Sequence, residues 1–274
     1  MIGNPLYTPT EVMQALYRAV LGRDPDPEGL KNYSEILTTD PGALLSVCEK
    51  MFESDEHRKC FDHAPAILDH SQYREFSILL RHHVAQSQRH GIIVDVGARG
   101  KDRSNSYDLL SQFGWRGVLV EANPALHESI RRDFADTNFE LVPTAVGPNS
   151  GVLPFYIGAN DDVSSLLRDN AAGWGDLRGV VEVEVQRLDN ILTKRMIPFD
   201  FDVLSLDIEG LDVDVLNDLV DNSDYRPLIV IIEASYDFET KSLADVGASD
   251  TLQKNYTIMD QTRSNLVLSL CDDR

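Results

Sequence analysis

Apolar residues recur at two different spacings along this chain of 274 residues. Over residues 1–88 they follow the helical period of three to four, as in the stripe from Met13 to Leu21 behind a Thr8–Glu11 capping box. Similar stripes predict helices near residues 40–53 and 65–88. The pattern therefore predicts a small all-helical N-terminal domain over residues 1–88.

From residue 89 onward, short apolar runs alternate with stripes of helical period. The predicted core strands end, in chain order, at Val96, Val120, Val146, Asp207 and Glu233, and a hairpin over residues 256–259 and 266–270 follows. An extra strand ending at Ile157 and a half-exposed strand ending at Val185 are predicted between the third and fourth core strands. Residues 139–146 are predicted to form one continuous strand. Apolar strands separated by helices are typical of a parallel sheet covered on both faces. The predicted fold class is therefore α/β, with a Rossmann-like seven-stranded sheet over residues 89–274.

Two acidic residues mark the ends of the first two strands. Asp95 precedes the turn at Gly97 by two positions, and Glu121 ends the apolar run from Gly117 to Val120. Folds of this type bind ligands at the carboxyl ends of their strands, where an acid after the second strand holds ribose hydroxyls. The pattern predicts a cofactor that carries a nucleoside.

The turn after the first strand favours S-adenosylmethionine over NAD. Pyrophosphate binding needs the G-x-G-x-x-G pattern, but Arg99 and Asp102 stand where its second and third glycines would be. Asp102 would also repel a pyrophosphate. The Asp-x-Gly turn suits a cofactor whose charged groups are an ammonium, a carboxylate and a sulfonium. A nucleotide-dependent oxidoreductase is therefore the disfavoured alternative.

The composition excludes some classes of binding partner and predicts the cellular compartment. The formal net charge of −20 argues against nucleic acid and anionic membrane surfaces, which both favour basic patches. The cysteines Cys48, Cys60 and Cys271 lack metal or redox spacing, which predicts reduced thiols in a cytoplasmic protein. No apolar run approaches membrane-spanning length, and the N-terminus shows no secretory signal.

A set of short motifs carries a resemblance to a known family over about residues 91–270. The motifs are Val94–Ala98, Gly114–Gly117, Val120–Pro124, Ala145–Gly147, Arg187–Asp189, Leu204–Gly210, Pro227–Glu233 and Asn265. In order and spacing this set resembles the FkbM-type S-adenosylmethionine-dependent methyltransferases, which implies their seven-stranded methyltransferase sheet. The chain departs from the family at Ala122, where proline is usual, and in the charged loop Lys101–Arg103.

The helical N-terminal part resembles a small bacterial domain of unknown function. The resemblance rests on the Leu-Gly-Arg-x-Pro-Asp-x-x-Gly core at Leu21–Gly29. That domain is often found beside enzymes of surface-glycan synthesis. The resemblance implies a glycan context and leaves open a role in binding a protein partner or in self-association.

The methyltransferase resemblance implies roles for particular residues. Those expected to bind S-adenosylmethionine are Asp95, Gly97 and Ala98 at its amino acid part, Glu121 at the ribose, and Asn123 and Ala145 at the adenine. Asp207, at the carboxyl end of the fourth core strand, is expected to be the catalytic or substrate-positioning carboxylate, with Glu233 as a second acid. Asp207 could instead only orient the ammonium of the cofactor.

Two further features leave alternatives open. Glu209 could cap the helix that follows it, or it could join Asp207 and Glu233 in holding a divalent cation, since hard cations choose carboxylate oxygens. A metal is not the favoured interpretation. The irregular segment 158–179 contains Ser164 and Ser165, and its length is typical of a lid or a binding loop.

These features favour an O-methyltransferase that methylates a hydroxyl of a sugar, a glycan or a secondary metabolite. Such a transfer needs two groups held in line and a proton removed as the new bond forms. The alternative is a non-catalytic protein of cofactor-binding fold that docks partners in a surface-glycan synthesis complex. The intact Asp95, Gly97, Glu121 and Asp207 argue against that alternative.

Overall fold

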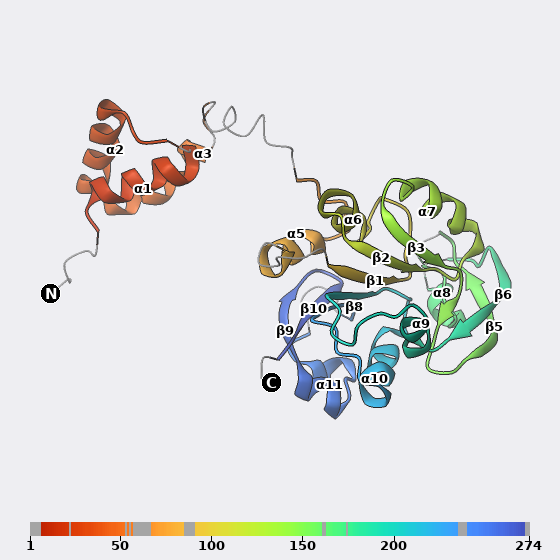
Figure 1. Ribbon diagram of the computed structural model, residues 1–274. Helices are drawn as coiled ribbons and strands as arrows, with labels where there is room; N and C mark the ends of the chain where they lie inside the picture. The colour runs from red at the N-terminus through yellow and green to blue at the C-terminus, as the bar shows by residue number, and fades with distance from the viewer. Residues whose placement is uncertain are drawn as a thin grey trace. The chain divides into compact units, whose positions relative to one another are not determined.

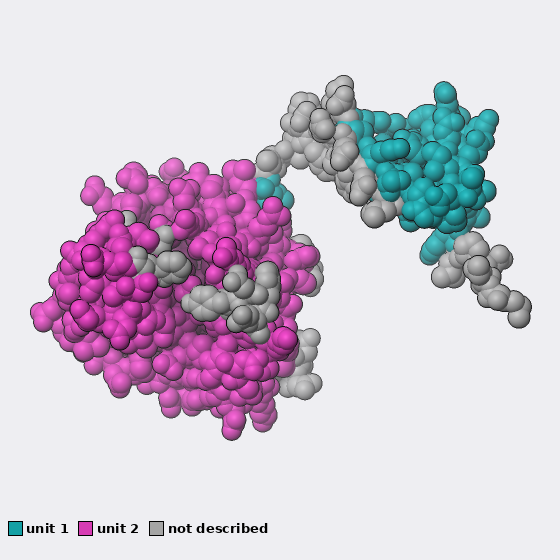
Figure 2. Space-filling model, turned by 180° about the vertical axis from the view of Figure 1, so that it is seen from behind, with its two compact units in different colours: residues 1–67 teal, residues 68–274 magenta. Residues whose placement is uncertain are grey.

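The chain folds into a helical unit and an α/β unit (Figure 1). The computed structural model describes residues 7–21, 23–52, 54, 56, 67–84, 91–160, 163–173, 175–234 and 240–271, so that Cys60 lies outside the described residues. The two compact units divide between Ile67 and Leu68 (Figure 2). Each unit buries an apolar core of its own.

The helical unit confirms the apolar periodicity of the N-terminal part. Its elements are α1 (Pro9–Leu21), α2 (Pro27–Thr39), the 3-10 helix η1 (Pro41–Ala43) and α3 (Leu44–Phe52). The predicted capping box is formed, because the Glu11 carboxylate accepts the backbone N–H of Thr8 (2.7 Å) and the Thr8 hydroxyl accepts that of Glu11 (3.3 Å). The stripe from Met13 to Leu21 is buried with Val47 and Met51 of α3.

Helix α5 (Glu75–His82) belongs to the α/β unit. Its residues Phe76 and Leu79 are fully buried in the same cluster as Trp115. Within the described residues it is shorter than the helix predicted over 65–88, whose two ends lie outside them. Because this apolar stripe packs on the sheet, the boundary between the units comes earlier than the one predicted at residue 88.

A seven-stranded sheet in the order β3-β2-β1-β7-β8-β10-β9 forms the centre of the α/β unit. Its strands are β1 (Ile92–Val96), β2 (Arg116–Val120), β3 (Asn138–Val142), β7 (Val203–Leu206), β8 (Ile229–Glu233), β9 (Tyr256–Gln261) and β10 (Asn265–Leu270). The first five in the sheet order run parallel, and β10 runs antiparallel to both β8 and β9. The parallel sheet with a closing C-terminal hairpin is therefore confirmed.

Two buried layers cover the two faces of this sheet. Val94 and Val96 of β1 join one core and Ile93 joins the other, since successive strand side chains point to opposite faces. The helices are α9 (Leu188–Lys194), α10 (Asp212–Asn222) and α11 (Asp250–Asn255) on one face, and α5, α6 (Tyr107–Phe113) and α7 (His127–Asp133) on the other (Figure 1). Helices on both faces confirm the Rossmann-like arrangement.

The connections contain the short helices η3 (Pro124–Leu126), α8 (Arg168–Ala171) and η5 (Leu243–Val246). Among the helices of the described residues, none combines the length and the apolar character that crossing a bilayer requires.

A second, three-stranded sheet has the order β4-β6-β5. Its strands are β4 (Ala145–Val146), β5 (Gly151–Ile157) and β6 (Gly179–Gln186). The single strand predicted over residues 139–146 is wrong, because β3 ends at Val142 and β4 pairs with β6. Pro143 follows the last residue of β3 and has no N–H with which to extend the ladder, and the Thr144 hydroxyl donates to the carbonyl of Glu184 (2.7 Å) in the second sheet.

A buried carboxylate connects α5 to the hairpin. Glu75 is fully buried and accepts hydrogen bonds from the backbone N–H of Tyr73 (2.8 Å), the side-chain amide of Asn265 (2.7 Å) and the hydroxyl of Thr262 (3.2 Å). Thr262 and Asn265 flank the turn between β9 and β10. Glu75 therefore holds that turn against the start of α5.

We predict that Glu75→Ala lowers the free energy of unfolding by about 3 kcal/mol, because two buried donors and one half-buried donor lose their shared acceptor. Chemical denaturation followed by circular dichroism measures this difference. The control Glu182→Ala removes an exposed carboxylate of β6 and should change stability by less than about 0.5 kcal/mol. Equal effects of the two substitutions would contradict the role given to Glu75.

Candidate functional site

A cavity of about 550 Å³ opens at the carboxyl ends of the parallel strands. Five of the residues that the sequence predicts for the site line this cavity, namely Gly97, Glu121, Ala145, Asp207 and Glu233. The remaining predicted cofactor residues, Asp95, Ala98 and Asn123, are buried behind its surface. The fold thus brings the ends of β1, β2, β7 and β8 together around one space.

The chain leaves β1 at Gly97 in a left-handed conformation. The φ angle of Gly97 is +85°, and a Cβ atom there would lie 1.8 Å from the carbonyl oxygen of Asp207. The backbone N–H of Asp207 donates to the carbonyl of Val96 (3.0 Å). Glycine is the residue that permits both this conformation and this approach. Gly97 therefore sets how closely the ends of β1 and β7 meet.

Asp95 and Ala98 support the turn from behind. The Asp95 carboxylate accepts a hydrogen bond from the Ser106 hydroxyl (2.6 Å). Burial raises the pKa of Asp95, and hydrogen bonds from Ser106 and Ser205 oppose that rise. The backbone N–H of Ala98 donates to the carbonyl of Val120 (3.1 Å), which links the turn to the end of β2.

Glu121 and Asn123 form the part of the site at the end of β2. The Glu121 carboxylate accepts the backbone N–H of Asn123. Burial raises the pKa of Glu121 to about 8, although this hydrogen bond and the positive charge of Arg99 oppose the rise. The Asn123 side-chain oxygen accepts the N–H of Ala125 (3.1 Å), while its Nδ2 is buried with no hydrogen-bond partner. A buried amide donor of this kind fits a ligand that brings an acceptor.

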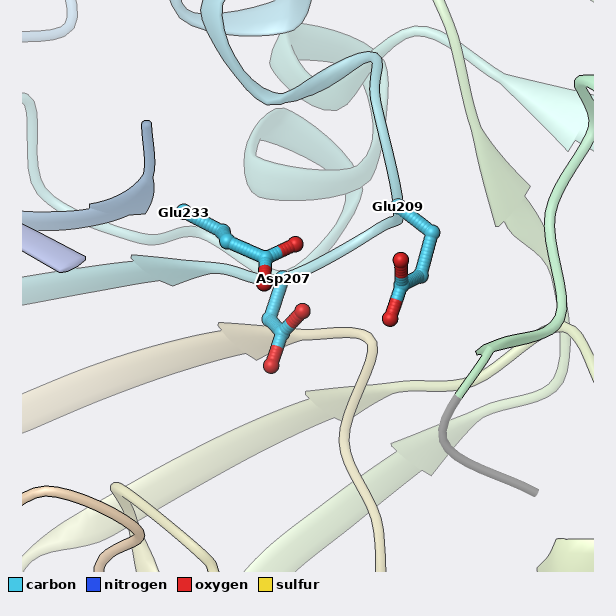
Figure 3. A group of neighbouring side chains, drawn as sticks. All are labelled: Asp207, Glu209 and Glu233. Atoms are coloured by element: carbon cyan, nitrogen blue, oxygen red, sulfur yellow. The ribbon is translucent and has the colours of Figure 1, made fainter. Parts of the chain in front are cut away.

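Three carboxylates face one another beside this region (Figure 3). One carboxylate oxygen of each of Asp207, Glu209 and Glu233 lies within 4.8 Å of the other two. Asp207 is open to water in the cavity, but protein surrounds it on its other sides, and this desolvation followed by the charge of Glu233 raises its pKa. Burial and then neighbouring acids raise the pKa of Glu209 and of Glu233 to about 8.

A tightly bonded turn directs Glu209 into this cluster. Glu209 has a left-handed φ of 57°, and its carbonyl accepts hydrogen bonds from the Ser165 hydroxyl (2.9 Å) and the Asn170 amide (3.0 Å). The Asp212 carboxylate accepts the backbone N–H groups of Ile208 (3.0 Å) and Gly210 (3.1 Å). The structure thus gives the amide-accepting role at the start of α10 to Asp212, and Glu209 lines the cavity.

The three carboxylates can act in two chemical ways. Like charges this close resist joint ionisation, so the group can hold and exchange protons near neutral pH. Carboxylate oxygens are also the ligands that hard divalent cations prefer. Both uses need the same side chains at the same strand ends.

The irregular segment 158–179 contributes to the cavity wall through Val163 and Ser164. Ser165 forms a bridge with Tyr156 of β5, so this part of the segment is tied to the small sheet. Asp161, Asp162 and Trp174 lie outside the described residues.

The site predicted from the sequence does not include the basic residues that line the cavity. Arg99, Arg103 and Arg263 line the cavity, and the charge of Arg99 opposes the rise in the pKa values of Glu121 and Asp207. Arg103 stands in the loop Lys101–Arg103 that departs from the family pattern, and Arg99 lies two residues before it, so this departure is a signal available in the sequence. Arg263 stands in the hairpin turn, where no motif marks it.

The fold and the cavity define a Rossmann-like methyltransferase architecture, with seven strands, a closing hairpin and a site at the strand ends. A family model described as the methyltransferase FkbM domain matches residues 95–257, which is more than half of the chain. The chain therefore belongs to the FkbM methyltransferase family, whose usual cofactor is S-adenosylmethionine. No individual curated protein matches the chain.

We predict that Gly97→Ala destabilises the protein by more than about 2 kcal/mol, because the new methyl group would collide with the Asp207 carbonyl in a left-handed backbone. Thermal unfolding measures the effect. The matched control is Gly151→Ala, since a Cβ atom at Gly151 meets nothing within 4 Å. A Gly97→Ala protein as stable as Gly151→Ala would contradict the close approach.

The acids of the cavity make stability depend on pH. The pKa values of Glu121, Glu209 and Glu233 are raised from 4.5 to about 8 in the folded protein. The folded state therefore holds extra protons between these values, and the resulting stability is lost as the pH rises through about 8. We predict that the free energy of unfolding falls between about pH 5 and pH 9.

Glu233→Gln should make this fall less steep, whereas the exposed control Glu182→Gln should keep the slope of the natural chain. Denaturant titrations at a series of pH values give the slopes. A profile that rises with pH, or equal slopes for all three proteins, would contradict the raised pKa values.

Proposed function

We propose that this chain is an S-adenosylmethionine-dependent O-methyltransferase whose acceptor is a hydroxyl of a sugar, a glycan or a secondary metabolite. The shared cavity carries the proposal. Glu121 and Gly97 stand on one side of it, and Asp207 and Glu233 stand at the ends of the neighbouring strands. A nucleoside and a hydroxyl can therefore be held beside each other with a carboxylate within reach of both.

The strand order supports this division of the cavity. Glu121 follows β2, Gly97 follows β1, Asp207 follows β7 and Glu233 ends β8, and these four strands are neighbours in that order. Adjacent strands lie about 4.8 Å apart, so three spacings extend over about 15 Å. We assign the ends of β2 and β1 to the cofactor and the ends of β7 and β8 to the acceptor hydroxyl.

The residues on the cofactor side fit S-adenosylmethionine. Glu121 offers carboxyl oxygens to the ribose hydroxyls, and Asn123 behind it holds the Glu121 carboxyl through its backbone N–H. Ala145 forms part of the wall, and Arg99 supplies a positive charge for the carboxylate of the amino acid part. S-adenosylmethionine, when bound, supplies an electrophilic methyl group.

Asp207 is the base in this proposal. It is open to the cavity, and its backbone is fixed by the hydrogen bond to Val96. Its raised pKa favours proton uptake, because a general base works best when its pKa is near the working pH. Glu233 is the second acid and can share the proton that Asp207 removes from the acceptor. In this scheme the carboxylates handle protons and need no divalent cation.

We also propose a binding role for the helical unit and a cytoplasmic location for the protein. The resemblance of residues 21–29 to a domain found beside glycan enzymes supports a role for this unit in binding a protein partner or in self-association. Cys48 and Cys271 are free thiols, which supports a cytoplasmic location.

Calorimetric titration tests the cofactor assignment. We expect saturable binding of S-adenosylmethionine and none of NAD. Glu121→Gln should weaken binding at least tenfold because it replaces a carboxyl oxygen that accepts from the ribose hydroxyls with an amide nitrogen that only donates, and the exposed control Glu182→Gln should bind as the natural chain does. A folded natural chain that ignores S-adenosylmethionine, or that binds NAD equally well, would overturn the assignment.

Methyl transfer from radiolabelled S-adenosylmethionine to a panel of sugars and glycans tests whether Asp207 is the general base. Asp207→Asn should keep cofactor affinity within about threefold and lose at least about a hundredfold in turnover, because proton removal is lost. A chelator should leave the turnover of the natural chain unchanged. Full turnover by Asp207→Asn would refute the assignment of Asp207 as the base. Cofactor binding without transfer to any acceptor would favour the non-catalytic alternative.

A further inference from the structure

We infer that the acceptor carries an anionic group, a carboxylate or a phosphate, and that Arg263 binds this group at the edge of the cavity formed by the hairpin. The inference rests on the proposed function, because it takes the ends of β2 and β1 to be occupied by the cofactor. It adds the chemical class of the acceptor, for which the family match gives no information.

Arg263 lies on the acceptor side because of the sheet order. Strand β10 is the neighbour of β8, and Asn265 at its start pairs with Glu233. The carbonyl of Ser264 accepts the backbone N–H of Ala234 (3.2 Å), which joins the hairpin turn directly to the end of β8. Arg263 and Ser264 both line the cavity. The order along the strand ends is therefore Glu121, Gly97, Asp207, Glu233 and then the Arg263 turn.

The turn that carries Arg263 is held by buried hydrogen bonds. Thr262 and Asn265 on either side of it are buried, and the backbone N–H of Thr262 donates to the carbonyl of Asn265 (2.8 Å). Both side chains donate to the buried carboxylate of Glu75. A backbone fixed in this way lowers the entropy lost when its side chain orders on a ligand. Glu75 thus acts as a positioning residue for the acceptor side.

The cavity lining carries both signs of charge. Glu121, Asp207, Glu209 and Glu233 line it together with Arg99, Arg103 and Arg263, so an anionic group of a ligand has to bind at an arginine. The charge of Arg99 opposes the rise in the pKa values of Glu121 and Asp207, which places Arg99 near both acids, and we assign it to the carboxylate of the cofactor. Arg263 lies beyond Glu233, at the far end from Glu121. Guanidinium groups bind carboxylate and phosphate through paired hydrogen bonds.

A second, open hollow continues from this edge of the cavity. Gln72, Tyr73 and Arg263 line both spaces, and the hollow adds Arg74 and Arg81. Arg81 forms an ion pair with Asp260 (3.2 Å). Arg74 therefore adds positive charge to this rim, while the Asp260 carboxylate offsets the charge of Arg81. An acceptor larger than one sugar ring can leave the cavity across this rim with its anionic group beside Arg263.

The test compares three small probes that share sugar hydroxyls and differ in charge. The protein is saturated with S-adenosylhomocysteine, which prevents turnover, and is titrated with methyl glucoside, glucuronate and glucose 6-phosphate. We expect at least one of the two anionic probes to bind at least tenfold more tightly than neutral methyl glucoside. Comparing glucuronate with glucose 6-phosphate distinguishes a carboxylate from a phosphate.

Arg263→Gln should reduce the affinity for the preferred anionic probe at least tenfold and leave the affinity for S-adenosylhomocysteine within twofold. The matched control is Arg131→Gln, on the exposed surface of α7, which should change neither. Equal binding of the three probes, no binding of either anion, or an unchanged affinity in Arg263→Gln would overturn the inference alone. A folded natural chain that fails to bind S-adenosylhomocysteine would overturn the proposed function as well.

Discussion

The site depends on the close approach of two strand ends. The Asp207 carbonyl occupies the space where any side chain at Gly97 would begin, and the Asp207 N–H is bonded to Val96. This contact joins β1, with its buried Asp95, to β7, which presents Asp207 to the cavity. Gly97 and Ala98 also bond to the carbonyl of Val120 at the end of β2. One glycine turn therefore aligns the ends of three neighbouring strands.

The alignment brings several acidic groups close together in a partly desolvated space. Glu121, Glu209 and Glu233 have pKa values of about 8 because desolvation opposes their charged forms. The strained turn at Glu209 is held by Ser165 and Asn170, so the irregular segment before β6 helps to maintain the cluster. The same desolvation that costs stability at high pH gives the carboxylates an affinity for protons near neutral pH, as proton removal from a hydroxyl requires.

The two halves of the cavity differ in how far the sequence predicts them. The apolar run of β1, Gly97 and Glu121 are local features of strand and turn, and they predict the cofactor side together with the parallel sheet and its hairpin. The acceptor side is built by Glu75, Thr262 and Asn265, which are distant in sequence. The spacing of apolar residues predicts that α5 is a helix with one buried face, but it does not show against which hydrophobic core that face packs.

The sequence by itself determined the class of the fold, the elements of the sheet and the acids at its strand ends, because side-chain period and turn chemistry are local properties. Tertiary structure decided that residues 145–146 pair with β6, beside which the Thr144 hydroxyl bonds to the Glu184 carbonyl. It also decided that Glu209 faces the cavity and that the hairpin turn carrying Arg263 joins the end of β8. Pairing, burial and charge environment arise from contacts between distant segments, and no local pattern specifies them.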